Sequence, residues 1–238
     1  MKKAKKFLSS FSRKEIILWC SSVIFITASF CVFDRENFLT LTASLIGVTS
    51  IILNAKGNPF GQLLMIIFSF IYGIISFTFS YYGEMLTYIG MTMPMSVFAL
   101  ISWLKNPYNG NKYEVKVNSI SKNEILFMCF LSAVITTIFY FVLTAFHTAN
   151  IVPSTISVTT SFLAVYLTFR RSPLFGLAYA FNDAVLIVLW VLASITDARY
   201  ISVVVCFAAF LINDVYGFLS WRSMKERQAS NNPQPQFR

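Results

Sequence analysis

The chain has 238 residues, of which 56% are hydrophobic and 12% are charged, and its mean hydropathy is +0.66. A soluble domain carries about 25% charged residues, so this composition excludes a water-soluble globular protein. The net charge of +9 does not indicate a nucleic-acid partner, because the basic residues stand at the ends of apolar segments.

Eight apolar segments, each of about 20 residues, follow one another along the chain. The first follows a basic leader. It has no small-residue cleavage site and ends at Asp34-Arg35-Glu36, so we expect an uncleaved helix rather than a signal peptide. The sequence therefore predicts an all-α membrane protein without a soluble domain. The predicted spans are residues 16–33, 38–54, 61–81, 85–104, 124–146, 151–169, 174–195 and 200–221.

The basic residues predict the orientation of these spans. Seventeen of the nineteen Lys and Arg residues fall in the leader, after even-numbered spans or in the tail, and only Arg35 and Arg199 fall on the other side. By the positive-inside rule, both termini are expected in the cytoplasm. A wrong number of spans would scramble this asymmetry. The last residues, rich in Asn, Pro and Gln, are expected to be disordered.

Two three-helix units resemble each other along the chain. Residues 56–61 (KGNPFG) match residues 171–176 (RSPLFG), 115 residues later, and both units close on a Ser-Trp pair. A three-helix unit ends on the opposite side of the membrane from its start, and the one helix between the units brings the chain back to the first side. The two units therefore run parallel. Transporters with parallel repeats bind solute at the interface between the repeats. The expected organisation is a leader with an extra helix (1–37), a first repeat (38–104), a loop with a linker helix (105–150), a second repeat (151–222) and a disordered cytoplasmic tail (223–238).

Two aspartates lie within predicted spans, and each follows an asparagine: Asn182-Asp183 and Asn213-Asp214. A charged residue at a helix centre costs about 2.5–3.5 kcal/mol on insertion scales, so such residues usually have a function. We expect all four side chains to bind solute. The structural alternative is that they bond neighbouring polar groups and hold the bundle together.

Aromatic residues share the helix faces of these aspartates. Tyr179 and Trp190 lie four residues before and seven after Asp183, and Tyr216 is expected to flank the solute with them. Carboxylates and amides bind vicinal hydroxyls, and aromatic faces stack on a flat ring and attract a cationic one. This combination suits a nucleoside-like solute.

The first unit offers polar residues for a second wall of the site. Tyr88 and Thr92 share a helix face. The candidates are Asn54, Gln62, Ser69, Tyr72, Tyr88 and Thr92. Among them, we expect Gln62, Tyr88 and Thr92 to bind solute. Pro94 lies within the fourth predicted span, where it forms either a hinge for alternating access or a fixed bend. Glu84 stands at the end of a span and is expected to be a solvated loop residue.

Over about residues 38–222, the chain resembles the PnuC family of bacterial vitamin B3 transporters. The resemblance rests on residues 56–61, on Tyr81-Tyr82-Gly83-Glu84-Met85, on the proline of the fourth span and on the Ser-Trp ending. It implies a 3+1+3 fold similar to SWEET sugar transporters, a homotrimer in the bacterial inner membrane, and facilitated diffusion of nicotinamide riboside. A cytoplasmic kinase then traps the solute by phosphorylation, without a stable complex. Older names give nicotinamide mononucleotide as the substrate.

The chain departs from the pattern of this family at two places. Members that carry nicotinamide riboside usually begin the seventh span with a Trp-rich stretch, where this chain has Phe175 to Tyr179. They also tend to have Gln two residues after the proline, where this chain has Ser96. Deoxynucleosides and thiamine, which relatives are thought to carry, therefore stay open as substrates.

A membrane-embedded enzyme is the alternative from another class. Two intramembrane aspartates suggest an aspartyl protease, but the Tyr-Asp and Gly-x-Gly-Asp patterns of those enzymes are absent around Asp183 and Asp214. The sequence has no phosphate-binding loop, and its four cysteines and one histidine lack metal-ligand spacing. We expect a transporter without catalytic residues, metal or cofactor.

Overall fold

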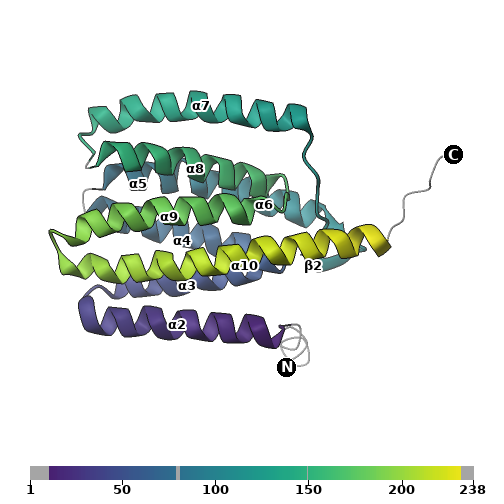
Figure 1. The fold of residues 1–238 in the computed structure, drawn as a ribbon, viewed down its shortest axis with the longest axis horizontal. Coiled ribbons are helices and arrows are strands. Elements are labelled where there is room, and N and C mark those ends of the chain that lie inside the picture. The colour runs from purple at the N-terminus through teal and green to yellow at the C-terminus, as the bar shows by residue number, and fades with distance from the viewer. Residues whose placement is uncertain (1–10, 79–80, 149, 232–238) are drawn as a thin grey trace.

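The computed structural model describes residues 11–78, 81–148 and 150–231. Within these ranges, eight helices are long and apolar enough to cross a membrane, and they lie side by side with their axes roughly aligned (Figure 1). The predicted all-α membrane fold is confirmed.

The bounds of the helices agree with the predicted spans to within a few residues, except at the C-terminus. The fourth span consists of three consecutive helical segments, α5 (Tyr82–Thr87), η1 (Tyr88–Thr92) and α6 (Met93–Lys105). The eighth span begins with a short helical turn, η2 (Ala198–Tyr200). A two-stranded antiparallel hairpin, β1–β2, follows α6. The elements are α2 (Arg13–Phe33), α3 (Phe38–Ala55), α4 (Phe60–Thr78), α5 (Tyr82–Thr87), η1 (Tyr88–Thr92), α6 (Met93–Lys105), β1 (Pro107–Tyr108), β2 (Asn111–Val115), α7 (Lys122–Ala145), α8 (Ile151–Phe169), α9 (Phe175–Ser194), η2 (Ala198–Tyr200) and α10 (Ile201–Asn231).

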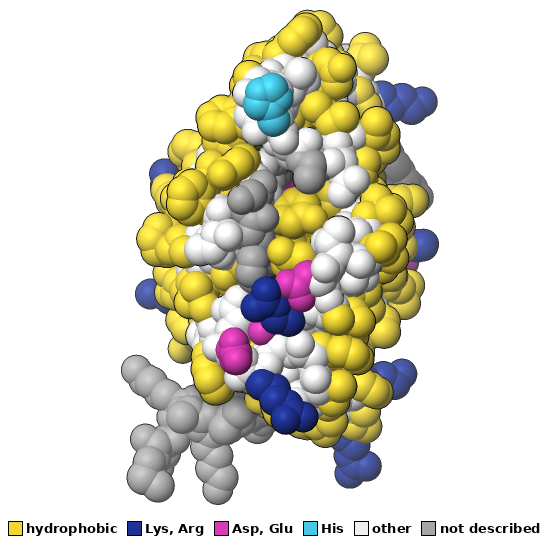
Figure 2. Space-filling view, turned by 90° about the vertical axis from the view of Figure 1, so that its left-hand side faces the viewer, with side chains coloured by type: hydrophobic (Ala, Val, Ile, Leu, Met, Phe, Trp, Pro, Cys, Tyr) yellow, Lys and Arg dark blue, Asp and Glu magenta, His cyan; other side chains and the backbone are white. Residues whose placement is uncertain are grey.

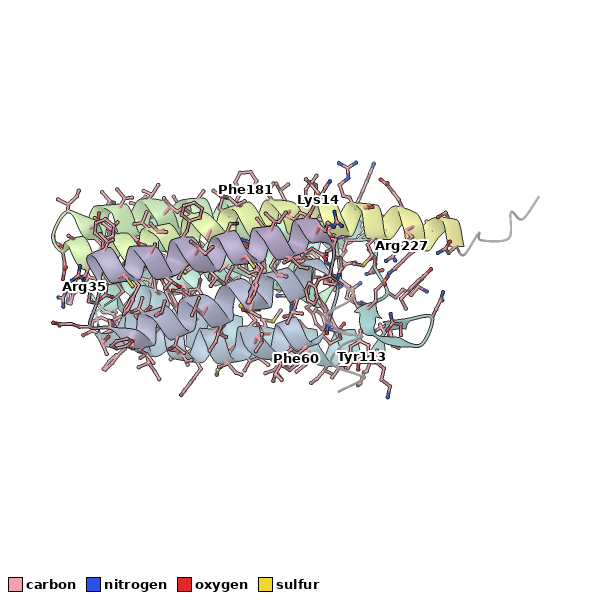
Figure 3. The ribbon with its side chains drawn as sticks, turned by 90° about the horizontal axis from the view of Figure 1, so that it is seen from below. Lys14, Arg35, Phe60, Tyr113, Phe181 and Arg227 are labelled. Carbon is pink, nitrogen blue, oxygen red and sulfur yellow. The ribbon has the colours of Figure 1, made fainter. Side chains whose placement is uncertain are left out.

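The bundle has two distinct ends. Lys14, Tyr113 and Arg227 lie toward the end where α2 begins and α10 finishes, which we call the basic end, and Arg35 lies at the opposite, distal end (Figure 3). Figure 2 looks onto the distal end, where hydrophobic side chains cover the flanks and acidic and basic side chains lie together toward the middle of the face. Apolar flanks are what helices in contact with lipid require.

The prediction of a disordered tail is wrong for residues 223–231, because α10 continues to Asn231. Polar contacts fix this extension to the hairpin. The Gln228 side chain donates to the carbonyl oxygen of Val115 at 3.0 Å and accepts from the Val117 amide at 2.8 Å. Arg227 forms an ion pair with Glu114. Residues 232–238 of the predicted tail lie outside the described residues.

The two units interlock at the basic end through their closing tryptophans. The Trp103 indole N–H donates to the carbonyl oxygen of Thr168 at 2.9 Å, and the Trp221 indole N–H donates to that of Asn54 at 2.7 Å. The preceding serines do the same one residue further on. The Ser102 hydroxyl donates to the carbonyl oxygen of Phe169 at 3.1 Å, and the Ser220 hydroxyl donates to that of Ala55 at 2.8 Å. Each unit therefore caps the C-terminal end of the other unit's first helix, where backbone carbonyls lack intrahelical partners.

The turns after these first helices correct the predicted alignment of the repeats by one residue. Gly57 and Arg171 both have left-handed backbones, with φ of 67° and 57°, so they are equivalent at a separation of 114. Lys56 therefore matches Arg170 rather than Arg171. The separation becomes 115 where α4 and α9 begin, at Phe60 and Phe175. A left-handed backbone is free for glycine but costs roughly 1–2 kcal/mol for arginine.

The packing of α9 on α10 gives a stability prediction. A Cβ at Gly176 would lie 2.7 Å from the Phe218 amide nitrogen and 2.8 Å from the Asp214 carbonyl oxygen, whereas one at Gly217 would lie 3.7 Å from Ala55. Because backbone cannot yield as a side chain does, Gly176→Ala should cost about 1–3 kcal/mol and Gly217→Ala much less. Thermal unfolding in detergent should show a clearly lower midpoint for the first variant alone, and equal midpoints would contradict the close packing.

Candidate functional site

A small closed cavity lies at the interface of the two units. The centre of a water-sized sphere can occupy about 20 Å³ of it. This is room for about one water molecule, far below the roughly 300 Å³ of the smallest ligand pockets. The lining residues come from both units: Ile51, Asn54, Met65, Phe68, Tyr88, Thr92, Ser161, Phe175, Tyr179, Asn182, Asp183, Phe210 and Asp214.

Two carboxyl groups from neighbouring helices of the second unit line the cavity. Asp183 on α9 is 3% exposed and Asp214 on α10 is 4% exposed, and the two interact electrostatically. Among the described residues, Oδ2 of Asp183 has no hydrogen-bond partner. Buried polar atoms are nearly always paired, so an acceptor left over at a cavity wall is a group that a bound solute can use.

Asn182 is held in place from the neighbouring helix α8. Its side-chain oxygen accepts hydrogen bonds from the hydroxyls of Thr160, at 2.8 Å, and Ser161, at 2.9 Å. These bonds fix which way the amide points. Its N–H groups are then the atoms left to donate to a solute.

A π-helical turn, η1, forms the wall contributed by the first unit. The Met93 amide bonds to the carbonyl oxygen of Tyr88, five residues back, and Pro94 follows directly. Proline has no N–H and its ring clashes with the carbonyl four residues earlier, so the helix widens just before it. This turn carries Tyr88 and Thr92, both of which line the cavity.

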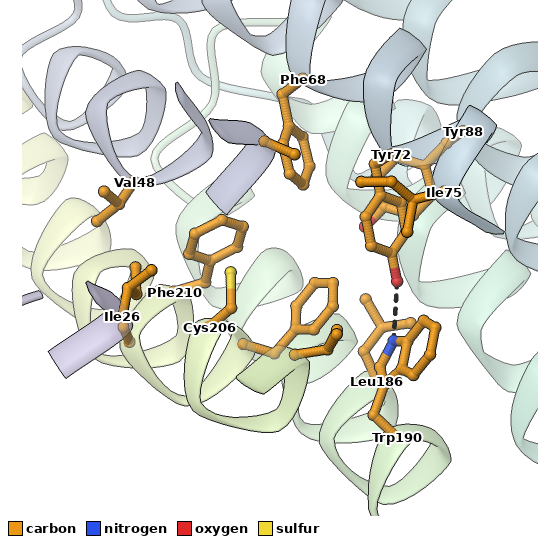
Figure 4. Packing of buried hydrophobic residues seen from close by; sticks show 14 of the residues in the cluster. Ile26, Val48, Phe68, Tyr72, Ile75, Tyr88, Leu186, Trp190, Cys206 and Phe210 are labelled. Carbon is orange, nitrogen blue, oxygen red and sulfur yellow. Dashed lines mark hydrogen bonds between the residues drawn. The ribbon is translucent and has the colours of Figure 1, made fainter. Parts of the chain in front are cut away.

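Aromatic side chains close the cavity toward both ends of the bundle. Toward the basic end, the Phe175 ring lies 4.8 Å from Trp221, whose own ring lies 5.2 Å from Trp103. Toward the distal end, the Trp190 indole N–H donates to the Tyr72 hydroxyl at 2.8 Å (Figure 4). The described residues therefore form an occluded arrangement.

The structure brings six of the ten predicted binding residues to this cavity. They are Tyr88, Thr92, Tyr179, Asn182, Asp183 and Asp214. They come from η1, α9 and α10, and thus from both repeats, as the repeat argument predicts.

Two of the remaining four face the extra helix α2 instead. The Asn213 amide donates to the Ser22 hydroxyl at 2.8 Å, and the Tyr216 hydroxyl donates to Glu15 at 3.3 Å. Glu15 also forms an ion pair with Lys56 at 3.0 Å. The side chains of Asn213 and Tyr216 therefore tie α2 to the bundle, which is the structural alternative that the sequence left open.

The last two lie near the cavity but do not line it. Gln62 donates to the side-chain oxygen of Asn54, at 2.9 Å, and so supports a lining residue from behind. Trp190 lies about two turns from Asp183 toward the distal end, where it packs against Tyr81 and Tyr200.

Sequence reasoning did not assign several lining residues. Most are aromatic or aliphatic, and nothing in an apolar membrane helix distinguishes a cavity-facing Phe68 from a packed one. Ser161 is different, because Ser154, Ser157 and Ser161 repeat on one face of α8 and all are buried. A serine stripe within a span is a sequence signal that could have found it. Among the described residues, no group of three or more His, Cys, Asp or Glu could hold a metal ion.

Comparisons with known proteins agree with this picture. Residues 37–223 match the family model of the nicotinamide mononucleotide transporter. The chain is 23% identical over 218 residues to the nicotinamide riboside transporter PnuC of Neisseria mucosa, covering 89% of this chain and 82% of that protein. A solved structure described as the crystal structure of the vitamin B3 transporter PnuC superposes with a TM-score of 0.81 at 22% identity, covering 92% of this chain and 94% of that one.

The solved structure shares the fold, and the family model spans most of the chain, including both repeats. The resemblance seen in the sequence is thereby confirmed. This chain belongs to the nicotinamide mononucleotide transporter family, and it is a membrane transporter rather than an enzyme.

Proposed function

We propose that this protein carries nicotinamide riboside across the bacterial inner membrane by facilitated diffusion. The observation that carries the proposal is one cavity between two repeats that joins two aspartates, an oriented asparagine amide and aromatic rings. The name of the Neisseria relative supports the same substrate. Asp183 and Asp214 accept hydrogen bonds from the ribose hydroxyls, and Asn182 donates one.

The rings that line the cavity provide a surface for the nicotinamide. Phe68 and Phe210 lie with their centroids 5.6 Å apart, and Tyr88 meets Phe68 edge-on at 5.8 Å. Aromatic faces stack on flat rings and attract cations, and the ring of nicotinamide riboside is a pyridinium cation. The two carboxyl groups add to this attraction because opposite charges interact strongly where water is excluded.

Transport requires the two units to move, because the closed cavity is too small for a nucleoside. We infer that one unit rocks against the other and opens each end in turn. The π turn before Pro94 is the hinge in this proposal, since a widened turn has fewer fixed hydrogen bonds than the α-helices around it.

The setting in the cell follows from charge and from the family. We infer that the basic end faces the cytoplasm, because seventeen of the nineteen Lys and Arg residues belong to that side. We also propose a SWEET-like homotrimer, and a cytoplasmic kinase that traps the imported solute without a stable complex.

The substrate is tested by uptake into liposomes that contain the purified protein. We expect saturable uptake of labelled nicotinamide riboside that excess unlabelled nicotinamide riboside blocks and thiamine or deoxyadenosine does not. The solute should be recovered chemically unchanged. Absence of this uptake, with uptake of labelled deoxyadenosine or thiamine instead, would keep the family and reassign the substrate.

The binding roles of the two aspartates are tested by Asp183→Asn and Asp214→Asn. A hydrogen bond to a charged group contributes about 1.5–3 kcal/mol, so each variant should lower the affinity for nicotinamide riboside about tenfold or more. Asp197→Asn is the matched control, since that partly exposed aspartate pairs with Arg199 outside the cavity. Initial uptake rates over a range of concentrations are the measurement. Wild-type affinity in both cavity variants would contradict the assignment.

The hinge is tested by Pro94→Ala. An N–H at this position lets η1 relax toward a regular α-helix, which turns Tyr88 and Thr92 away from the cavity. We expect slower uptake at unchanged thermal stability. Pro153→Ala is the control, because Pro153 lies in the first turn of α8, where a missing N–H breaks no helix bond. Uptake by Pro94→Ala at the control's rate would mean that the proline only sets a fixed bend.

A further inference from the structure

Glu84 is not a solvated loop residue as the sequence suggested. It lies in α5, is 1% exposed, and neither of its carboxyl oxygens has a hydrogen-bond partner among the described residues. None of the ion pairs between described residues includes it. A carboxyl group within a membrane span is costly and, when no basic side chain pairs with it, marks a functional position.

Gly83 brings Glu84 close to the neighbouring helices. A Cβ at Gly83 would lie 3.0 Å from side-chain atoms of both Leu143 and Thr148 and 3.6 Å from the Cβ of Ser154, so a larger residue would require these side chains to shift. Glu84 then faces Ser157 of α8, whose hydroxyl lies close enough to interact with the Glu84 carboxyl group. The local backbone is therefore arranged so that an acidic side chain enters the bundle.

Glu84 lies one helical turn from the cavity, on its distal side. Tyr88, four residues later, lines the cavity, and both Tyr88 and Tyr72 lie near Glu84. On the facing helix, the buried serines 154, 157 and 161 repeat along one face and end at the cavity. These two rows of polar groups form a buried polar line that runs from the distal part of the bundle to the central cavity.

Aromatic rings border this line. The Tyr72 centroid lies 4.4 Å from that of Tyr88, and the Tyr72 hydroxyl accepts the hydrogen bond from Trp190 (Figure 4). Trp190 in turn packs against Tyr81, with centroids 4.9 Å apart. A flat organic cation at this place is attracted by the charge of the carboxylate and, separately, by the faces of the aromatic rings.

We propose that Glu84 is a specificity residue on the distal access path, where its carboxylate pairs with a cationic ring of the solute before the solute reaches the central cavity. This inference rests on the proposed function and adds to it the selection of cationic over neutral nucleosides. A divalent metal ion fits poorly, because it requires several oxygen ligands and Glu84 is one carboxylate among hydroxyls. A weakly hydrated ring cation needs only one counter-charge and a face to stack on.

The test compares two solutes of nearly equal size and different charge. Nicotinamide riboside is cationic, and its two-electron-reduced dihydro form is neutral. In liposomes, Glu84→Gln should lower kcat/KM for the cationic solute about tenfold or more while that for the neutral solute changes little. Glu84→Asp keeps the charge and should keep the preference. Glu124→Gln is the control, since Glu124 pairs with Arg170 at the start of α7.

The outcomes separate this inference from the proposed function. If wild-type protein carries nicotinamide riboside and Glu84→Gln leaves the ratio of the two solutes unchanged, Glu84 does not read charge and the inference is wrong. A loss of both solutes in Glu84→Gln, with Glu84→Asp also inactive, shows a structural role and overturns it as well. If wild-type protein does not carry nicotinamide riboside, the same variants are compared on cationic thiamine and neutral deoxyadenosine. Carriage of neutral solutes alone would then overturn both proposals.

Discussion

The exchange of tryptophan hydrogen bonds between the two units is the interaction on which the rest of the structure depends. Backbone carbonyls at the end of a helix have no intrahelical partner, and in a membrane water cannot replace one. The carbonyl oxygens of Thr168 and Asn54 accept from turn amides of their own repeat, and Trp103 and Trp221 each add a second hydrogen bond across the unit boundary. These reciprocal hydrogen bonds therefore join the two three-helix units to each other at the basic end.

This junction also determines where the cavity lies. Trp221 packs on Phe175, which lines the cavity from the basic side, and Gly176 directly after it lets α9 approach α10 within backbone contact. The close approach sets Asp183 and Asp214 against each other in a buried region. In the proposed function, one bound solute satisfies both carboxyl groups, which offsets part of the cost of burying them.

The distal side of the cavity is built differently. Ring contacts among Tyr72, Tyr81 and Trp190 and the hydrogen bond from Trp190 to Tyr72 join the units there, in place of backbone caps. Ring pairs contribute about 0.5–1.5 kcal/mol each beyond their buried area. The extra helix α2 is bound by polar side chains of α10, among them Asn213, so it strengthens the second repeat along its length. A bundle with strong caps at one end and ring contacts at the other is suited to open unequally.

Hydropathy and charge placement in the sequence determined the eight spans and the two repeats, because lipid forces apolar helices and every polar exception is costly. The same cost singled out Asp183 and Asp214. Helix rotation was decided by tertiary packing alone: neighbouring residues point about 100° apart, so Asp214 faces the cavity while Asn213 faces α2. Packing also decided that Glu84 is buried, because Gly83 lets α5 press against α7 and α8, and no sequence pattern near a span's end records such a contact.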